Sequence, residues 1–198
     1  GCGCFWGAEK CFWKLPGVVT TSVGYAGGEK NNPTYYEVCS GLTGHSEVVR
    51  VIWDKREIDV SDLLKMFWEC HDPTQKNRQG NDMGTQYRSA IYYKNENNIK
   101  TILASKEQYQ TELSKKNLGL IETEIKMIDS YFYAEQYHQQ YLASAGSRQY
   151  CSASPTKVKL GVFTGSNYKL EDHIWENFNW EVDKCVLRSD NNPIKNNI

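Results

Sequence analysis

Residues 3–17 read GCFWGAEKCFWKLPG and lead directly into VVTTSVGY at residues 18–25. Three apolar residues of the first stretch recur at helical spacing, and its closing Leu-Pro-Gly stops a helix, so we predict a short helix over Gly7 to Lys14. Alternating valine and aromatic residues predict that the second stretch is a strand. A helix followed at once by a strand favours a fold in which helices pack on a sheet.

The rest of the chain interleaves further strands and helices. The polar segment Thr74 to Thr85 is expected to be a long irregular loop. The whole order predicts an α/β (α+β) fold, a two-layer mixed sheet with helices packed on it. The patterning predicts strands at Ser46 to Trp53, Tyr87 to Tyr93 and Ile121 to Ile128, and helices at Ser61 to Cys70, with Ser61 as N-cap, at Asn97 to Lys116 and at Ala134 to Ala143.

The regular pattern dissolves after about Ser144 into serine, glycine and other polar residues. A chain of 198 residues is somewhat longer than an average domain. We therefore predict a catalytic domain at residues 1–145 and an irregular C-terminal tail at residues 146–198. We expect the serine-rich stretch around Cys151 to be mobile.

The composition argues against two classes of partner. Lysine plus arginine number 23 and aspartate plus glutamate 24, which leaves no basic field for nucleic acid. The longest apolar runs fall far short of the roughly 20 residues that span a bilayer. We expect neither nucleic acid nor a membrane as partner, and we expect a monomer.

The chain has seven cysteines, an odd number in a chain too large to need a disulfide framework. Reduced thiols in a reducing compartment such as the cytoplasm are the simplest interpretation. The chain opens on Gly1 without a charged or apolar leader, so no targeting segment is expected in it. Cys11, Cys39 and Cys70 lie in or beside predicted elements and are expected to be buried.

Cys4 is the first candidate for chemistry, because it directly precedes the first predicted helix. Unpaired amides and the helix dipole favour an anion there, so the pKa of the thiol is expected to fall. A small buried core cysteine is an equally good interpretation of this residue alone. Phe5 and Trp6 are adjacent in the first helical turn, and an aromatic wall beside a thiol suits a methyl thioether group.

Glu47 begins a strand that otherwise consists mainly of valine, isoleucine and tryptophan. Apolar neighbours disfavour a carboxylate, so Glu47 is expected to stay protonated and act as an acid. The alternative is that Glu47 is an exposed glutamate at a strand end without a catalytic role. Asp82 and Tyr87, near a loop-to-strand junction, and Tyr35 are candidates to stabilise oxygen, although spacing alone does not promote them among 13 tyrosines.

These segments together resemble the methionine sulfoxide reductase A family. GCFWG at residues 3–7 matches its nucleophile motif, and GHSEV at residues 44–48 resembles its acid motif. Further matches are HDP at residues 71–73 with GNDMGTQYRS at residues 80–89, and YHQQYL at residues 137–142. Ordered blocks spread over most of the chain are far more specific than one short motif.

The resemblance implies a ferredoxin-like core and reduction of the S epimer of methionine sulfoxide, free or in proteins. It implies an attack that turns the nucleophile into a sulfenic acid, a disulfide that resolves it, and thioredoxin as the external reductant, with no metal or organic cofactor. The roles it implies are nucleophile for Cys4, acid for Glu47, hydrogen-bonding support for Tyr35, Tyr87 and Asp82, and a methyl pocket for Phe5 and Trp6.

The tail is where the sequence departs from the family. Cys151 keeps the position of a resolving cysteine, but serine, alanine and proline surround it in place of the glycine-rich stretch common in the family. Cys185 lies in a segment without a counterpart, and we expect it only in a later exchange.

Two rival functions remain open on the sequence alone. An acyl transferase would pair Cys4 with His45 or His138, although no third orienting group is evident. A metal-binding module would use Cys2, Cys4 and a histidine, although one residue between the cysteines is tighter than the usual zinc spacing.

Overall fold

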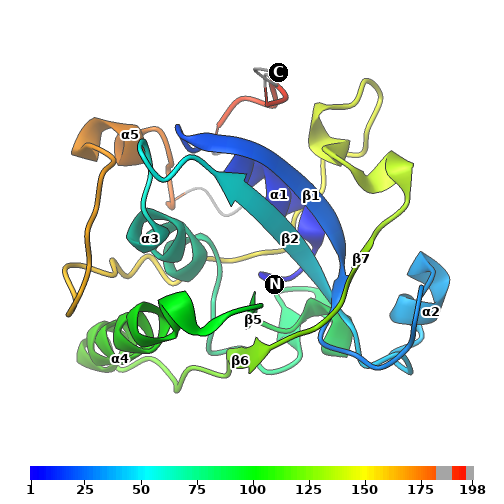
Figure 1. The fold of residues 1–198 in the computed structure, drawn as a ribbon, viewed down its shortest axis with the longest axis horizontal. Coiled ribbons are helices and arrows are strands. Elements are labelled where there is room, and N and C mark those ends of the chain that lie inside the picture. Colours follow the sequence, from blue (N-terminus) through cyan, green and yellow to red (C-terminus); the bar gives the residue numbers. More distant parts are fainter. Residues whose placement is uncertain (182–188, 195–198) are drawn as a thin grey trace.

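The computed structural model describes residues 1–181 and 189–194, and helices and strands alternate along most of that length (Figure 1). The elements in chain order are α1 (Phe5–Trp13), β1 (Val18–Ala26), α2 (Tyr35–Cys39), β2 (Ser46–Trp53), α3 (Val60–Cys70), β3 (Arg78–Gln79), β4 (Asp82–Met83), β5 (Ala90–Tyr93), α4 (Ile99–Lys115), β6 (Glu124–Met127), β7 (Tyr131–Tyr133) and α5 (Asp172–Glu176), with short 3-10 turns at Thr85–Tyr87, Glu96–Asn98, Gln136–His138 and Tyr141–Ala143.

The strands of the described residues form three small sheets. β1 is the centre of an antiparallel sheet in the order β2-β1-β7, β5 pairs with β6 in parallel, and β3 with β4 forms a short hairpin. In the largest sheet Tyr25 lies opposite Glu47. The predicted α/β (α+β) fold is confirmed, with its strands divided among several sheets.

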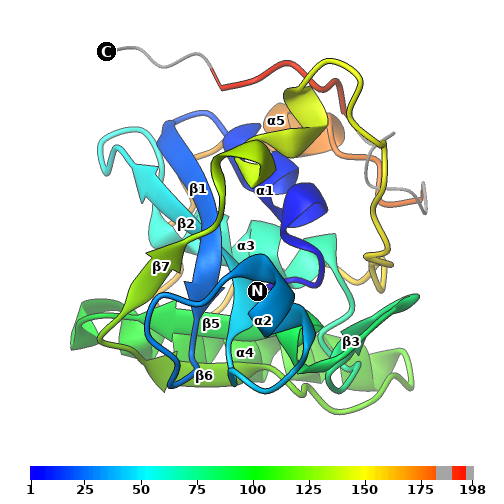
Figure 2. The same ribbon diagram turned by 90° about the vertical axis from the view of Figure 1, so that its right-hand side faces the viewer.

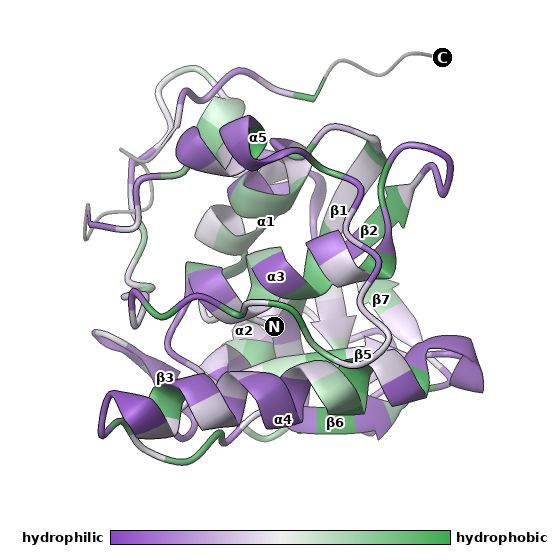
Figure 3. Cartoon of the chain, turned by 90° about the vertical axis from the view of Figure 1, so that its left-hand side faces the viewer, coloured by the Kyte–Doolittle hydropathy of each residue, from purple (hydrophilic) through white to green (hydrophobic). Residues whose placement is uncertain are grey.

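Helix α1 lies against β1 and β2, α3 packs beside α1, and α4 packs beside α3 (Figure 1). Helix α3 is capped by Asp59, whose side chain accepts the amide of Ser61 while Asp62 completes a capping box. The N-cap is therefore Asp59 and not Ser61. Helix α4 buries Ile102, Ser105, Tyr109 and Leu113, and Figure 3 shows hydrophilic residues over much of the rest of its surface.

Figure 2 shows the tail running along one side of the molecule, with α5 near α1, and Figure 3 shows the chain crossing in front of α3 before it reaches α5. Much of the tail has neither helix nor strand, as expected, but six of its apolar side chains are buried in the same core as those of α1 and α3. Helix α5 contributes one of them. The six are Val158, Leu160, Phe163, Trp175, Phe178 and Trp180.

Three local expectations differ from the structure. The helix predicted at Ala134 to Ala143 is wrong, because two 3-10 turns occupy this segment and Gln140 between them has a φ of 46°. Helix α2 was not predicted, and the loop Thr74 to Thr85 contains the β3–β4 hairpin. Cys39 is exposed, whereas Cys11 and Cys70 are buried as expected.

No helix among residues 1–181 and 189–194 is long and apolar enough to cross a membrane.

Candidate active site

Cys4 is the N-cap residue of α1, with a non-helical backbone and a half-buried side chain. Its carbonyl accepts the amide of Ala8 at 3.3 Å, so the thiol sits at the first turn of the helix. Gly3 lets the chain before Cys4 pass close to Gln79. Its φ is 87°, and a Cβ atom there would lie only 2.6 Å from the Cβ of Gln79.

Glu47, the second residue of β2, points its carboxyl group at the same helical turn. The amide of Phe5 donates a hydrogen bond to Glu47 Oε2 at 2.9 Å, and only 1% of the Glu47 residue is exposed. The residue that follows the thiol is thus fixed to the carboxyl group. The structure brings together Cys4 and Glu47, which are 43 positions apart in the sequence.

Burial raises the pKa of Glu47 to about 8, against the Phe5 hydrogen bond, which lowers it, and with a smaller contribution from the charge of Asp82. The carboxyl group is therefore mostly protonated at neutral pH, as the sequence predicted. Burial also raises the pKa of the Cys4 thiol well above its usual value, and the charge of Glu47 adds to that rise. The expected fall in the Cys4 pKa is wrong, because burial outweighs the helix amides that favour the thiolate.

Two phenols stand close to this pair. Burial, a hydrogen bond with Cys39 and the charge of Glu47 all raise the pKa of Tyr35. Burial, then the charges of Glu47, Cys39 and Asp82, raise the pKa of Tyr87. Both hydroxyl groups therefore keep their protons and can donate hydrogen bonds to an oxygen atom beside Glu47.

Asp82, in the β3–β4 hairpin, binds the tail. Its carboxylate accepts a hydrogen bond from the Tyr150 hydroxyl at 2.6 Å and a second one from the Ser152 hydroxyl. These two residues flank Cys151. The segment that the sequence suggested to be mobile is thus anchored on both sides of its cysteine.

Phe5 and Trp6 have different surroundings. Phe5 is 1% exposed and packs in a small core with Val23 and Tyr25 of β1. Trp6 is half-buried and stacks on Tyr141, with ring centroids 3.8 Å apart. Trp6 is therefore partly exposed two residues after Cys4, whereas Phe5 belongs to the core.

His138 is a site residue that sequence reasoning assigned only to a rival function. Its Nδ1 accepts a hydrogen bond from Trp6 Nε1 at 3.0 Å, and its ring lies 4.6 Å from that of Tyr35. Burial lowers its pKa, although nearby Glu135 opposes this, so the ring tends to be neutral. Its Nε2 atom is buried without a hydrogen-bond partner. The sequence feature that could have identified His138 is the YHQQYL block at residues 137–142.

Glu135 was not singled out in the sequence, yet it fixes Tyr35. Its two carboxyl oxygens accept the amide of Tyr35 and the hydroxyl of Tyr25, each at 2.8 Å. It therefore ties the start of α2 to β1.

His45 is bonded at both ring nitrogens within the connection between β1 and β2, to the amide of Gly28 at 3.1 Å and the carbonyl of Lys30 at 2.7 Å. It is a structural histidine, which removes one partner that an acyl transferase would need.

The cysteines expected to take part in recycling differ in oxidation state. Cys4 is a free thiol, whereas Cys151 is disulfide-bonded. Cys185, the other cysteine expected in recycling, lies outside the described residues.

Comparison with known proteins gives consistent matches. The family model described as peptide methionine sulfoxide reductase matches residues 1–168. The peptide methionine sulfoxide reductase MsrA of Azotobacter vinelandii is 58% identical over 160 residues, covering 81% of this chain and 74% of that protein. The protein of the same name from Vibrio vulnificus is 57% identical over 158 residues, covering 80% and 75%.

Two solved structures resemble the fold. Methionine sulfoxide reductase A of Corynebacterium diphtheriae superposes with a TM-score of 0.68 at 45% identity, covering 82% of this chain and 80% of that one. Reduced Mxr1 from Saccharomyces cerevisiae gives a TM-score of 0.70 at 36% identity, covering 77% and 86%.

Proposed function

The chain belongs to the peptide methionine sulfoxide reductase family, and we propose that it reduces methionine-S-sulfoxide, free or in proteins, to methionine. The observation that carries the proposal is the 2.9 Å hydrogen bond from Phe5 to Glu47, which fixes a largely protonated carboxyl group beside the Cys4 thiol. A nucleophile and an acid held together are what reduction of a sulfoxide needs.

In the first step the Cys4 sulfur, as its thiolate, attacks the sulfoxide sulfur while Glu47 gives its proton to the sulfoxide oxygen. The sulfur–oxygen bond of the substrate breaks and the oxygen passes to Cys4 as a sulfenic acid, while methionine leaves with the electron pair. The Glu47 carboxylate takes a proton back from solvent. The substrate sulfur is reduced by two electrons and the Cys4 sulfur is oxidised by two.

The neighbouring side chains suit the two ends of the sulfoxide group. The neutral phenols of Tyr35 and Tyr87 donate hydrogen bonds to the oxygen as negative charge develops on it. The ring of Trp6, supported by Phe5, packs against the methyl group, because sulfur and methyl groups favour contact with aromatic faces. Because the sulfoxide oxygen and the methyl group bind to different side chains, only one epimer can place both groups correctly.

In the second step a thiol attacks the Cys4 sulfenic acid, forming a disulfide and releasing water. We assign this role to Cys151, because Asp82 binds the residues on both sides of it. Burial and the hydrogen bond to Asp82 raise the pKa of the neighbouring Tyr150, and the charge of Cys4 adds a smaller rise, which is evidence that this segment lies near Cys4. Asp82 thus serves to dock the resolving segment.

The disulfide then passes along the tail. Attack by the Cys185 thiol on Cys151 frees the Cys4 thiol and leaves a Cys151–Cys185 disulfide, which a dithiol such as thioredoxin reduces. A free Cys4 beside a disulfide-bonded Cys151 is the state that this exchange leaves. The cycle ends with reduced thiols, which suits a reducing compartment such as the cytoplasm. We assign the first half-reaction to residues 1–145 and recycling to residues 146–198.

The proposal is tested by following the two epimers of an N-blocked methionine sulfoxide separately, with dithiothreitol as reductant. We expect the S epimer to be converted to the thioether and the R epimer to remain. Cys4→Ser is expected to abolish the reaction, since a serine hydroxyl cannot form the sulfenic acid. Consumption of the R epimer instead, or of neither, would overturn the proposed activity.

A further inference from the structure

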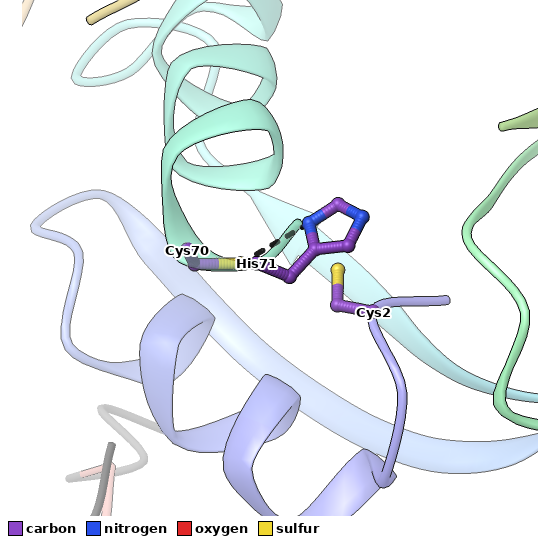
Figure 4. A group of neighbouring side chains, drawn as sticks. All are labelled: Cys2, Cys70 and His71. Carbon is purple, nitrogen blue, oxygen red and sulfur yellow. Dashed lines mark hydrogen bonds between the residues drawn. The ribbon is translucent and has the colours of Figure 1, made fainter. Parts of the chain in front are cut away.

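The three buried histidines of the chain differ in how their ring nitrogens are bonded. His45 and His71 form a hydrogen bond with each of the two ring nitrogens. Figure 4 shows the His71 ring at the end of α3, next to Cys70. The Nδ1 of His138 accepts a hydrogen bond from Trp6 Nε1 at 3.0 Å, whereas its Nε2 is buried without a hydrogen-bond partner. The orientation of the His138 ring is therefore linked to that of Trp6.

This hydrogen bond determines the protonation state of the His138 ring. The indole nitrogen of a tryptophan can only donate, so Nδ1 of His138 accepts and the proton of the neutral ring lies on Nε2. Burial lowers the pKa of His138 against the charge of Glu135, and the neutral ring that the bond requires is thereby favoured. Glu135 Oε2 lies 4.0 Å from Nε2, which is too far for a hydrogen bond. His138 is thus set as an acceptor for Trp6.

The His138 ring also packs against rings of both helices that carry candidate substrate-binding residues. Its centroid lies 5.8 Å from that of Trp6 on α1 and 4.6 Å from that of Tyr35 on α2. Phe5 and Tyr137 pack against the same ring, at 5.1 Å and 4.2 Å. His138 therefore contacts both Trp6 and Tyr35, which come from different elements.

The turn that carries His138 is fastened to the sheet and to α1. The side chain of Gln139 bonds the amide and the carbonyl of Val23 at 2.8 Å and 3.0 Å. The amide of Gln140 donates a hydrogen bond to Glu9 Oε2 at 2.7 Å, and Glu9 is fully buried. Because the two residues that follow His138 are bound to β1 and α1, its ring has a fixed position from which it can orient other side chains.

We propose that His138 is a positioning residue that holds the Trp6 ring in a fixed place relative to Tyr35 and thereby sets the preference for one epimer. This inference rests on the proposed function, in which Trp6 binds the methyl group and Tyr35 the oxygen of the sulfoxide. Exchanging these two groups on the sulfur atom converts one epimer into the other, so discrimination requires that both binding places are held precisely. Without the bond to His138, Trp6 keeps its stacking on Tyr141 but loses the contact that fixes its N–H edge.

The test compares two variants of His138 that differ in their ability to accept the Trp6 hydrogen bond. His138→Asn has an acceptor oxygen as many bonds from Cβ as Nδ1, whereas His138→Leu is apolar. In His138→Leu, the KM for the S epimer of N-acetylmethionine sulfoxide should rise about fivefold, as for the loss of one ordinary hydrogen bond. The ratio of kcat/KM for the S epimer to that for the R epimer should fall by a similar factor.

His138→Asn should recover most of both losses, and the single-turnover rate at saturating substrate should change little in either variant. His173→Leu, at an exposed histidine of α5, is the control and should match the unaltered chain. An unaltered chain that reduces neither epimer would overturn the proposed function and this inference with it. An S-selective chain whose selectivity is the same in His138→Leu would overturn this inference alone.

The same two variants made in Trp6→Phe separate positioning from packing, because phenylalanine has no N–H group to donate. In that background His138→Asn and His138→Leu should have equal KM values. Equal values in the presence of Trp6, or an equally large difference in Trp6→Phe, would show that His138 acts through packing alone and would overturn the proposal.

Because His138→Leu can fail to fold, a second measurement uses the native histidine in chain labelled with nitrogen-15. NMR should show that Nδ1 of His138 is unprotonated and has a scalar coupling to Trp6 Nε1 across the hydrogen bond. Addition of the S epimer to Cys4→Ser, which cannot reduce it, should shift the Trp6 N–H resonance, and the R epimer should shift it less. A proton on Nδ1, or equal shifts with both epimers, would contradict the proposal.

Discussion

The nucleophile region and the tail of this chain are held in place by different kinds of hydrogen bond. Cys4 stands where α1 meets a sheet in which β1 pairs with β2 residue by residue from Thr20 to Ala26. The tail is fixed by side chains of α3 that accept its backbone amides: Ser61 binds Asn167, Asp62 binds Lys169 and Leu170, and Glu69 binds Leu160, at 2.9–3.2 Å.

This difference matches the two halves of the proposed cycle. The attack on a sulfoxide needs a thiol and an acid in fixed relative positions, which a helix and a sheet provide. Resolution needs a cysteine that approaches and then passes the disulfide on. The hydrogen bonds from Tyr150 and Ser152 to Asp82 hold the segment around Cys151, and such local anchors open at lower free energy than a strand ladder. Changes in the first region should therefore alter the chemical step, and changes in the second should alter recycling or stability.

The largest expected effect is that of Glu47→Gln on the first half-reaction. The amide still accepts the Phe5 hydrogen bond but cannot deliver a proton, so the single-turnover rate at neutral pH should fall about 10²–10⁴-fold. Rapid quench with quantification of methionine measures this rate. Glu29→Gln, at an exposed loop position, is the matched control. An unchanged rate in Glu47→Gln would reduce Glu47 to a structural role and break the comparison.

The pH dependence of the same step sharpens the assignment. Because burial raises the pKa of Glu47 to about 8, its proton is present below pH 8 and is lost above it. Both the rate of reduction and the rate of Cys4 alkylation are proportional to the fraction of Cys4 that is thiolate. Dividing the first rate by the second therefore removes the dependence on that fraction. This ratio should be constant below about pH 7 and fall about tenfold per pH unit well above pH 8.

In Glu47→Gln the ratio of the two rates should not depend on pH. A ratio that falls equally in that variant would show that another group supplies the proton.

Trp6 offers a smaller effect, confined to the substrate. Trp6→Ala removes the aromatic face and should lower kcat/KM about tenfold, in the range found for one lost apolar contact in a pocket. Trp6→Phe keeps a ring over Tyr141 but loses the hydrogen bond to His138, so it should recover part of the loss. Alkylation of Cys4 by a small reagent should change little in either. Equal losses in both assays would point instead to a damaged start of α1.

The smallest expected effect on the chemical step is that of a change at Glu69, a residue of α3 that binds the tail. Glu69 is 1% exposed and bonds Leu160, Lys65 and Lys159. Glu69→Gln leaves one acceptor oxygen and removes the charge, so the free energy of unfolding should fall by about 1–3 kcal/mol. Single-turnover reduction should be nearly unchanged. Urea unfolding and quench measurements test both, with exposed Glu107→Gln as control. A large loss in single turnover would mean that the two regions are not separable.

The same contrast explains what could be predicted from the sequence. Periodicity marks α1, β1, β2 and α3, because their burial repeats along the chain. The tail has no period, since the groups that fix it are on α3. The helix expected at Ala134 to Ala143 was wrong for a related reason: the side chain of Gln139 bonds the backbone of Val23, which replaces a helical turn with a contact to β1.

One feature could have been predicted from the sequence and was not, and others could not have been predicted from it. Helix α2 could have been found, because Thr34 and Glu37 form a capping box whose spacing is visible in the sequence. The approach of Cys2 to Cys70 and His71, whose side chains lie within 4.8 Å of one another, could not, because only the tertiary fold brings the two segments together. The rise in the Cys4 pKa was missed for the same reason, since burial of the thiol is not a property of its neighbours in sequence.

The most direct measurement follows the oxygen to Cys4 and the disulfide to Cys151. Reduced Cys151→Ser is mixed with methionine-S-sulfoxide in the presence of a sulfenic-acid trap, and peptides are mapped by mass spectrometry. The account predicts one equivalent of methionine per chain, the trap on Cys4, and no further turnover with thioredoxin. In the unaltered chain, the trap should be replaced by a disulfide between Cys4 and Cys151. A trap on another cysteine, or resolution as fast without Cys151 as with it, would contradict the account.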